Sequence, residues 1–108
     1  DFTYIDNVIQ ANILSLTTNN KNSINTVYNI AYGSRNTLNE LIAYLKKYLS
    51  EFDSKISTIE VVYGPNRAGD IPHSHASITK AKENLNYDPQ FSLQKGLREA
   101  VKWYWANI

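Results

Sequence analysis

A short stretch, "YGPNRAGDIPHSH" at residues 63–75, gathers most of the side chains in this sequence that could do chemistry. Arg67, Asp70, His73 and His75 fall within nine positions, and the glycines and prolines among them exclude a helix. Arginine presents a planar fork of donors that suits phosphate oxygens, and aspartate accepts hydrogen bonds from sugar hydroxyls. The pattern is therefore compatible with a stiff loop that binds a phosphorylated sugar through Arg67 and Asp70.

A local ion pair between the same two side chains is the simpler interpretation. Arg67 and Asp70 stand three residues apart, and charged loop residues are usually solvated and weakly paired. Taken alone, the residue types and their spacing favour this ion pair over ligand binding.

Other kinds of chemistry find less support in the sequence. His73 and His75 could place two imidazoles on one side of an extended segment, but no third ligand has matching spacing, so we expect loop histidines and no metal site. The chain has no cysteine, no glycine-rich phosphate loop and no pattern that joins serine, histidine and aspartate into a triad. We therefore predict no catalytic, cofactor-binding or metal-binding residues within this chain.

Length and charge limit the class of protein. The 108 residues suffice for one domain, and the net charge of +1 combines both signs along the chain. This balance gives no reason to expect nucleic acid or a membrane surface as a partner, and the chain has no apolar run long enough to span a bilayer. A cytoplasmic protein is the default expectation. The chain opens on Asp1 followed by an apolar segment, which suggests a piece of a longer protein.

Alternating strand and helix patterns predict an α/β fold. Residues 2–5, 26–32 and 57–64 are rich in β-branched and aromatic residues and are expected to be strands. Because the predicted strands alternate with helices, the sheet should be small and mostly parallel.

Four helices are predicted between and after these strands. Asp6 is expected to cap the first one, whose apolar residues share one face: Ile5, Val8, Ile9, Ile13 and Leu16. Thr37 and Glu40 form a capping box ahead of a helix over 38–52, and Ser92 is expected to cap a last helix over 93–108. A short helix is expected at about 77–85.

Four segments, in this order, resemble a known family: "DFTYIDN", "YNIAYGSRNTLNEL", "RAGDIPHSHASITKAKENLNYDP" and "LQKGLREAVKWY". They resemble the C-terminal part of the extended short-chain dehydrogenase/reductases, the NAD-dependent epimerases and dehydratases of nucleotide sugars. The most similar group is the UDP-N-acetylglucosamine 4-epimerases that supply polysaccharide and lipopolysaccharide synthesis. Residues 1–108 would then be the substrate-binding portion of an extended Rossmann-type enzyme.

The resemblance implies roles for particular residues. Arg67 would contact the diphosphate of a UDP-sugar, and Asp70 would lie near the ribose hydroxyls. Ser74, where epimerases of unacetylated sugars often carry a tyrosine, would leave room for an N-acetyl group. Tyr44 and Lys47 are three residues apart rather than the four of the family's catalytic pair, and Tyr44 lies in a helix whose apolar face is explained by packing, so we do not expect a catalytic pair here.

The resemblance also implies what lies outside this chain. NAD and the catalytic residues would belong to an N-terminal Rossmann domain, against which residues 1–32 would pack and through which the enzyme would form a homodimer. The chain by itself should then be inactive. A dehydratase or decarboxylase of the same family, or a non-catalytic module that binds a phosphorylated ligand, remain as alternatives.

Overall fold

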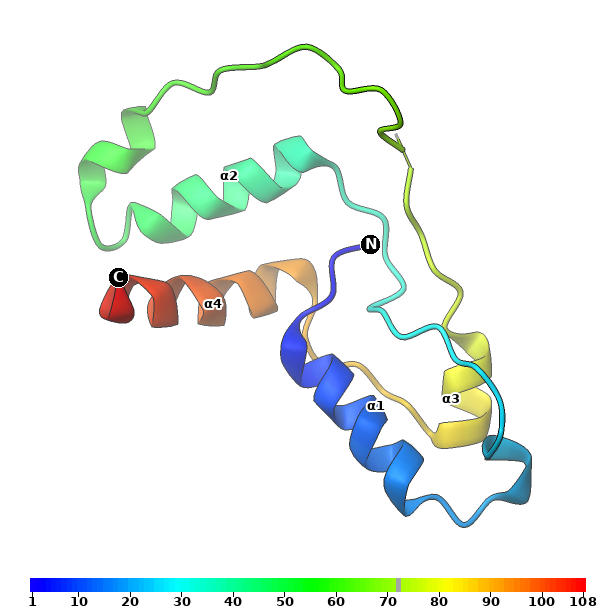
Figure 1. Ribbon diagram of the computed structural model, residues 1–108. Helices are drawn as coiled ribbons and strands as arrows, with labels where there is room; N and C mark the ends of the chain where they lie inside the picture. Colours follow the sequence, from blue (N-terminus) through cyan, green and yellow to red (C-terminus); the bar gives the residue numbers. More distant parts are fainter. Residues whose placement is uncertain (72) are drawn as a thin grey trace.

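The computed structural model describes residues 1–71 and 73–108, and these ranges contain four α-helices (Figure 1). The α-helices are α1 (Ile5–Thr17), α2 (Leu38–Leu49), α3 (Thr79–Leu85) and α4 (Leu93–Asn107). Two short 3₁₀ helices, η1 (Lys21–Ser23) and η2 (Ser54–Thr58), follow α1 and α2.

The helices form two packed groups rather than one compact body. Helix α1 packs on α3, which also contacts η1, whereas α2 lies beside α4 and contacts η2 (Figure 1). The radius of gyration is 17.1 Å. A compact chain of this length would have a value of about 13 Å. The structure is therefore elongated and leaves much apolar surface uncovered.

The main core lies between α1, α3 and the segment that precedes α2. Its buried members are Ala11, Ala31, Ile78, Ala81, Leu85 and Tyr87. Tyr87 is 1% exposed and donates a hydrogen bond from its hydroxyl to the carbonyl oxygen of Ala31 at 2.7 Å. Burial raises the pKa of Tyr87, since the charged phenolate is less well solvated there.

Helix α1 buries only a narrow side, and it reaches this core through Ala11 and the partly buried Leu14. Asn7 and Ala11 are buried at 1% and 2% exposure. The large apolar residues of the predicted stripe stay at 45% exposure or more: Ile5, Ile9, Ile13 and Leu16. The sequence thus predicted an apolar face correctly, but no other part of the described chain covers it.

Two amide side chains of α1 hold the segment that leads into α4. Asn7 donates from Nδ2 to the carbonyl of Phe91 at 2.8 Å, and its Oδ1 accepts from the backbone N–H groups of Gln90 and Phe91 at 3.1 Å each. Gln10, one turn later, donates to the carbonyl of Asp88 and accepts from its N–H at 2.8 and 2.9 Å. These bonds join positions about 80 residues apart.

The predicted capping residues behave differently at different helices. The capping box of Thr37 and Glu40 is confirmed, with the two reciprocal bonds to backbone N–H groups present. Ser92 is confirmed as the cap of α4, where its side chain accepts from the N–H of Lys95. Asp6 was predicted wrongly, because α1 begins at Ile5 and the Asp6 carboxylate lies in the first turn, where the helix dipole favours a negative charge.

The predicted sheet is wrong, since the described residues contain no β-strand. Strand-forming residues need a neighbouring strand that accepts and donates the ladder hydrogen bonds. In the 26–32 segment, side chains meet some of the backbone groups instead: Lys80 Nζ donates to the carbonyl of Val27, and Tyr87 to that of Ala31. The 57–64 segment begins inside η2, and its later residues face solvent.

Candidate functional site

The loop that carries Arg67 and Asp70 crosses from η2 to α3 on one side of the molecule (Figure 1). Its described residues from 62 to 71 are exposed. The N–H of Asp70 donates to the carbonyl of Arg67 at 3.2 Å, and Gly69 has a φ of 89°. This is a β-turn with a glycine at the position that requires positive φ. The turn brings the two charged side chains to the same end of the loop.

The two charged groups form the ion pair that the simpler interpretation expects. Arg67 Nε lies 3.6 Å from Asp70 Oδ2, and the side chains are 86% and 58% exposed. A pair this exposed contributes little stability. An arginine carries five N–H donors, so the guanidinium keeps donors to offer to an anion. The pair therefore holds the guanidinium near the turn without blocking its chemistry.

Both ends of the loop are anchored to the helical part of the chain. On the first side, Lys46 Nζ donates to the carbonyl of Ile59 at 2.6 Å, and the Tyr63 hydroxyl donates to Asn39 Oδ1 at 3.1 Å. On the second side, His75 Nε2 lies 3.1 Å from the carbonyl oxygen of Gly33. Arg67 and Asp70 lie between these anchors.

Ser74 lies at the second anchor, on an exposed part of the chain. Its carbonyl oxygen accepts a hydrogen bond from the backbone nitrogen of Asp1 at 2.6 Å, and His75 follows it directly. The structure therefore places Ser74 apart from the Arg67–Asp70 turn but on the same continuous loop. His73 is also exposed, and the described residues contain no group of three or more His, Asp or Glu side chains that could hold a metal ion.

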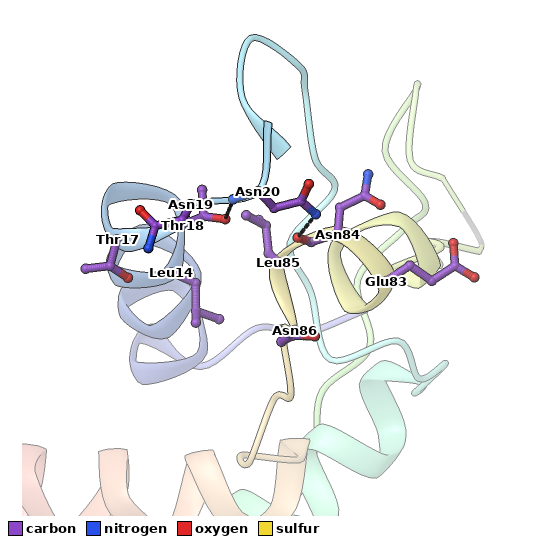
Figure 2. Close-up of a pocket in the computed structure, with 9 residues that line it drawn as sticks. All are labelled: Leu14, Thr17, Thr18, Asn19, Asn20, Glu83, Asn84, Leu85 and Asn86. Carbon is purple, nitrogen blue, oxygen red and sulfur yellow. Dashed lines mark hydrogen bonds between the residues drawn. The ribbon is translucent and has the colours of Figure 1, made fainter. Parts of the chain in front are cut away.

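A hollow of about 370 Å³ lies elsewhere, between the ends of α1 and α3 (Figure 2). Its lining is mostly amide and hydroxyl side chains, without an arginine or lysine: Leu14, Thr17, Thr18, Asn19, Asn20, Glu83, Asn84, Leu85 and Asn86. Several of these groups already bond one another, as Asn20 Nδ2 does with the carbonyl of Asn84 at 3.3 Å. Because a diphosphate needs cationic partners, this hollow is a poor site for a nucleotide.

Tyr44 serves the packing of α2 on α4, as expected. Its hydroxyl accepts a hydrogen bond from Gln94 Nε2, and its ring stacks on that of Tyr48 at 6.2 Å between centroids. These contacts account for the tyrosine without a catalytic role.

Sequence reasoning missed the part that Gly33 plays beside the site. Gly33 has a φ of 85°, and a Cβ added there would lie 3.0 Å from Ile78 Cδ1. Gly33 directly follows the 26–32 segment, which was predicted to be a strand. Its N–H donates to Asp1 Oδ2 at 3.0 Å while its carbonyl meets His75, so it joins three distant segments. No local pattern reports such contacts.

Comparison with known proteins shows which proteins this chain resembles. No family model matches the chain. The chain is 30% identical over 114 residues to UDP-glucuronate 4-epimerase 4 of Arabidopsis thaliana, covering 96% of this chain and 25% of the relative. It is 30% identical over 110 residues to a UDP-glucuronate 4-epimerase of Thermodesulfobacterium geofontis, covering 100% of this chain and 31% of the relative.

A solved structure gives the same result. The UDP-glucose 4-epimerase of Thermotoga maritima, crystallised with UDP-glucose, matches 98% of this chain with a TM-score of 0.81 and 36% identity. The chain covers 31% of that protein. This chain is therefore homologous to a region of the UDP-sugar 4-epimerases and spans about a quarter to a third of their length. Within the described residues, no helix is long and apolar enough to cross a bilayer.

Proposed function

We propose that this chain is the UDP-sugar-binding part of an NAD-dependent UDP-sugar 4-epimerase, a cytoplasmic enzyme of polysaccharide or lipopolysaccharide synthesis. One observation carries the proposal: nearly the whole chain aligns, in sequence and in structure, with a region of proteins that epimerise UDP-sugars. The loop geometry supports it, because Arg67 and Asp70 share one exposed turn with donors and acceptors turned to solvent.

In this proposal the chain binds the nucleotide and leaves the reacting centre to the region outside it. Bound NAD supplies hydride removal from C4 of the sugar and hydride return to the other face. Arg67 holds the diphosphate, and Asp70 accepts from the ribose hydroxyls. Binding energy placed in the unreacting UDP retains the 4-keto sugar while it turns.

Two sugars are candidates for the substrate. The small Ser74 side chain leaves space beside C2 of the sugar, and its hydroxyl can bond an acetamide, which favours UDP-N-acetylglucosamine. The names of the relatives from Arabidopsis thaliana and Thermodesulfobacterium geofontis favour UDP-glucuronate instead. We propose the N-acetylated sugar first, and the two are separated by assaying both with UDP-glucose as a reference.

The exposed face of α1 fits a role in a larger protein. Four large apolar residues at helical spacing are solvent-exposed in this chain, whereas the relatives are three to four times as long. We propose that residues 1–32 pack against the Rossmann domain of the full-length enzyme and that this domain also forms the homodimer. Covering such a stripe removes apolar area from water, which is the main favourable term in association.

The test is Arg67→Ala in the full-length protein. Loss of a charge-assisted bond to phosphate costs about 1.5 to 3 kcal/mol, or roughly a ten- to hundredfold loss of UDP affinity by calorimetry. Arg98→Ala is the matched control, because Arg98 is an exposed arginine of α4 whose guanidinium lies 3.4 Å from the carboxylate of Glu51. We expect UDP affinity to be unchanged in that control.

Three results would contradict parts of the proposal. Equal UDP affinity in wild type and Arg67→Ala would return Arg67 to a surface ion pair. A 4-keto-6-deoxy or decarboxylated product from the intact enzyme would replace the epimerase with a dehydratase or decarboxylase. Binding of UDP without turnover, by a full-length protein that lacks NAD, would favour a non-catalytic module.

A further inference from the structure

A closed ring of hydrogen bonds lies at the base of the loop that carries Arg67. The backbone nitrogen of Asp1 donates to the carbonyl of Ser74 at 2.6 Å, and the N–H of Gly33 donates to Asp1 Oδ2 at 3.0 Å. His75 Nε2 closes the ring on the carbonyl of Gly33 at 3.1 Å. The four residues come from three separate parts of the chain, and the ring ties the end of the loop to the Gly33 turn.

The loop contributes one backbone group to this ring, the Ser74 carbonyl, and one side chain, His75. Among the described residues from 64 to 75, it is the only side chain that hydrogen-bonds outside the loop. Because the Gly33 carbonyl is an acceptor, His75 must carry a proton on Nε2. Gly33 itself lies against Ile78, because a Cβ added at Gly33 would come within 3.0 Å of Ile78 Cδ1.

The position of this contact determines what it can control. His75 directly follows Ser74, whereas the Arg67–Asp70 turn is held by its own backbone hydrogen bond and ion pair. Loss of the His75 contact should therefore loosen Ser74, which keeps only the bond of its carbonyl to the Asp1 nitrogen, and leave the Arg67 turn intact. Its effect on a bound UDP-sugar should appear at the sugar and not at the nucleotide.

We propose that His75 is a positioning residue that, by bonding the Gly33 carbonyl, holds Ser74 where it meets the sugar of the bound nucleotide sugar. This inference rests on the proposed function. It goes further, because neither His75 nor Gly33 need touch the substrate. The hydrogen bond between His75 and Gly33 would make the affinity for the sugar, and hence the choice of sugar, depend on a contact that does not involve the substrate.

The experiment compares His75→Leu with His75→Gln in the full-length protein. Glutamine places an N–H donor near the position of Nε2, whereas leucine fills similar space without a donor. Calorimetry measures the affinity for UDP and for the UDP-sugar on which the wild type is most active among UDP-N-acetylglucosamine, UDP-glucuronate and UDP-glucose. With one exposed neutral hydrogen bond removed, His75→Leu should bind the UDP-sugar roughly twofold more weakly and UDP as tightly as wild type. His75→Gln should restore the affinity for the UDP-sugar.

The outcomes separate this proposal from the function on which it rests. If His75→Leu binds the UDP-sugar like wild type, or weakens UDP and UDP-sugar equally, the positioning role is overturned while the epimerase proposal stands. If the wild type binds no UDP, the proposed function fails and the positioning role fails with it. Should His75→Leu not fold, His75→Asn provides the test, because its donor is too short to reach Gly33 and the same selective loss is expected.

Discussion

Replacing Asn7 by alanine should destabilise the contact between α1 and the segment before α4 far more than expected for a polar residue, which is usually at the surface. The side chain is 1% exposed and bonds three backbone groups of the segment before α4, namely the N–H of Gln90 and the N–H and carbonyl of Phe91. Alanine would leave all three without this partner in a place that is partly buried. Each buried unsatisfied group costs about 1 to 3 kcal/mol, so even the low end of this range gives a loss of about 3 kcal/mol.

Amide hydrogen exchange of the 88–91 segment, followed by mass spectrometry on the full-length protein, measures this loss locally. A loss of about 3 kcal/mol corresponds to roughly hundredfold faster exchange, because each factor of ten is worth about 1.4 kcal/mol. Gln10→Ala is the matched control. Gln10 makes two similar bonds to Asp88, but these are exposed, so water replaces them at little cost.

Equal exchange rates in the two variants would refute the reasoning. Such a result would mean that burial does not determine how much these hydrogen bonds stabilise the segment, or that other contacts hold the segment before α4 in place. One such contact is the packing of Phe91 on Tyr4, whose ring centroids are 4.8 Å apart.

The remaining predictions concern packing, titration and substrate choice. Gly96→Ala should lower the melting temperature in spite of alanine's better helix propensity, because its Cβ would lie 2.6 Å from Tyr4 Cβ, an atom fixed to the backbone. Burial raises the pKa of Tyr87 above its ordinary value of 10.0, so the unfolded chain loses this proton at lower pH than the folded chain, and the free energy of unfolding falls above pH 10. In urea titrations, Tyr87→Phe should reduce this alkaline fall. At neutral pH the same variant should lower the free energy of unfolding by about 1 to 3 kcal/mol, because the carbonyl of Ala31 loses its hydrogen-bond donor. Ser74→Tyr in the full-length enzyme should suppress turnover of UDP-N-acetylglucosamine and spare UDP-glucose; equal loss of both would exclude Ser74 as the residue that selects the sugar.

The sequence predicted which residues form the loop of the candidate site, but not the contacts that attach this loop to the rest of the chain. The glycines and prolines around Arg67 and Asp70 predicted a loop, and the structure has one, closed by a turn at Gly69. The spacing also predicted the ion pair. The anchor between His75 and Gly33 was not predictable, because it joins residues 42 positions apart and depends on how two loops happen to meet.

The sequence by itself determined the helices and two of their caps. The capping box of Thr37 and Glu40 and the cap at Ser92 need only groups three residues away, so the same bonds form wherever the helix lies. The apolar stripe of α1 was likewise evident from its period.

Only the tertiary structure decided what those elements face. Helix α1 buries Asn7 and exposes its isoleucines, because a distant backbone segment offers three hydrogen-bonding groups to that amide while no described segment covers the apolar side. The segments at 26–32 and 57–64 have the composition of strands but meet no neighbouring strand in the described chain. A helix satisfies its backbone within four residues, whereas a strand and a buried amide depend on partners far along the chain, and residue type cannot say where those partners lie.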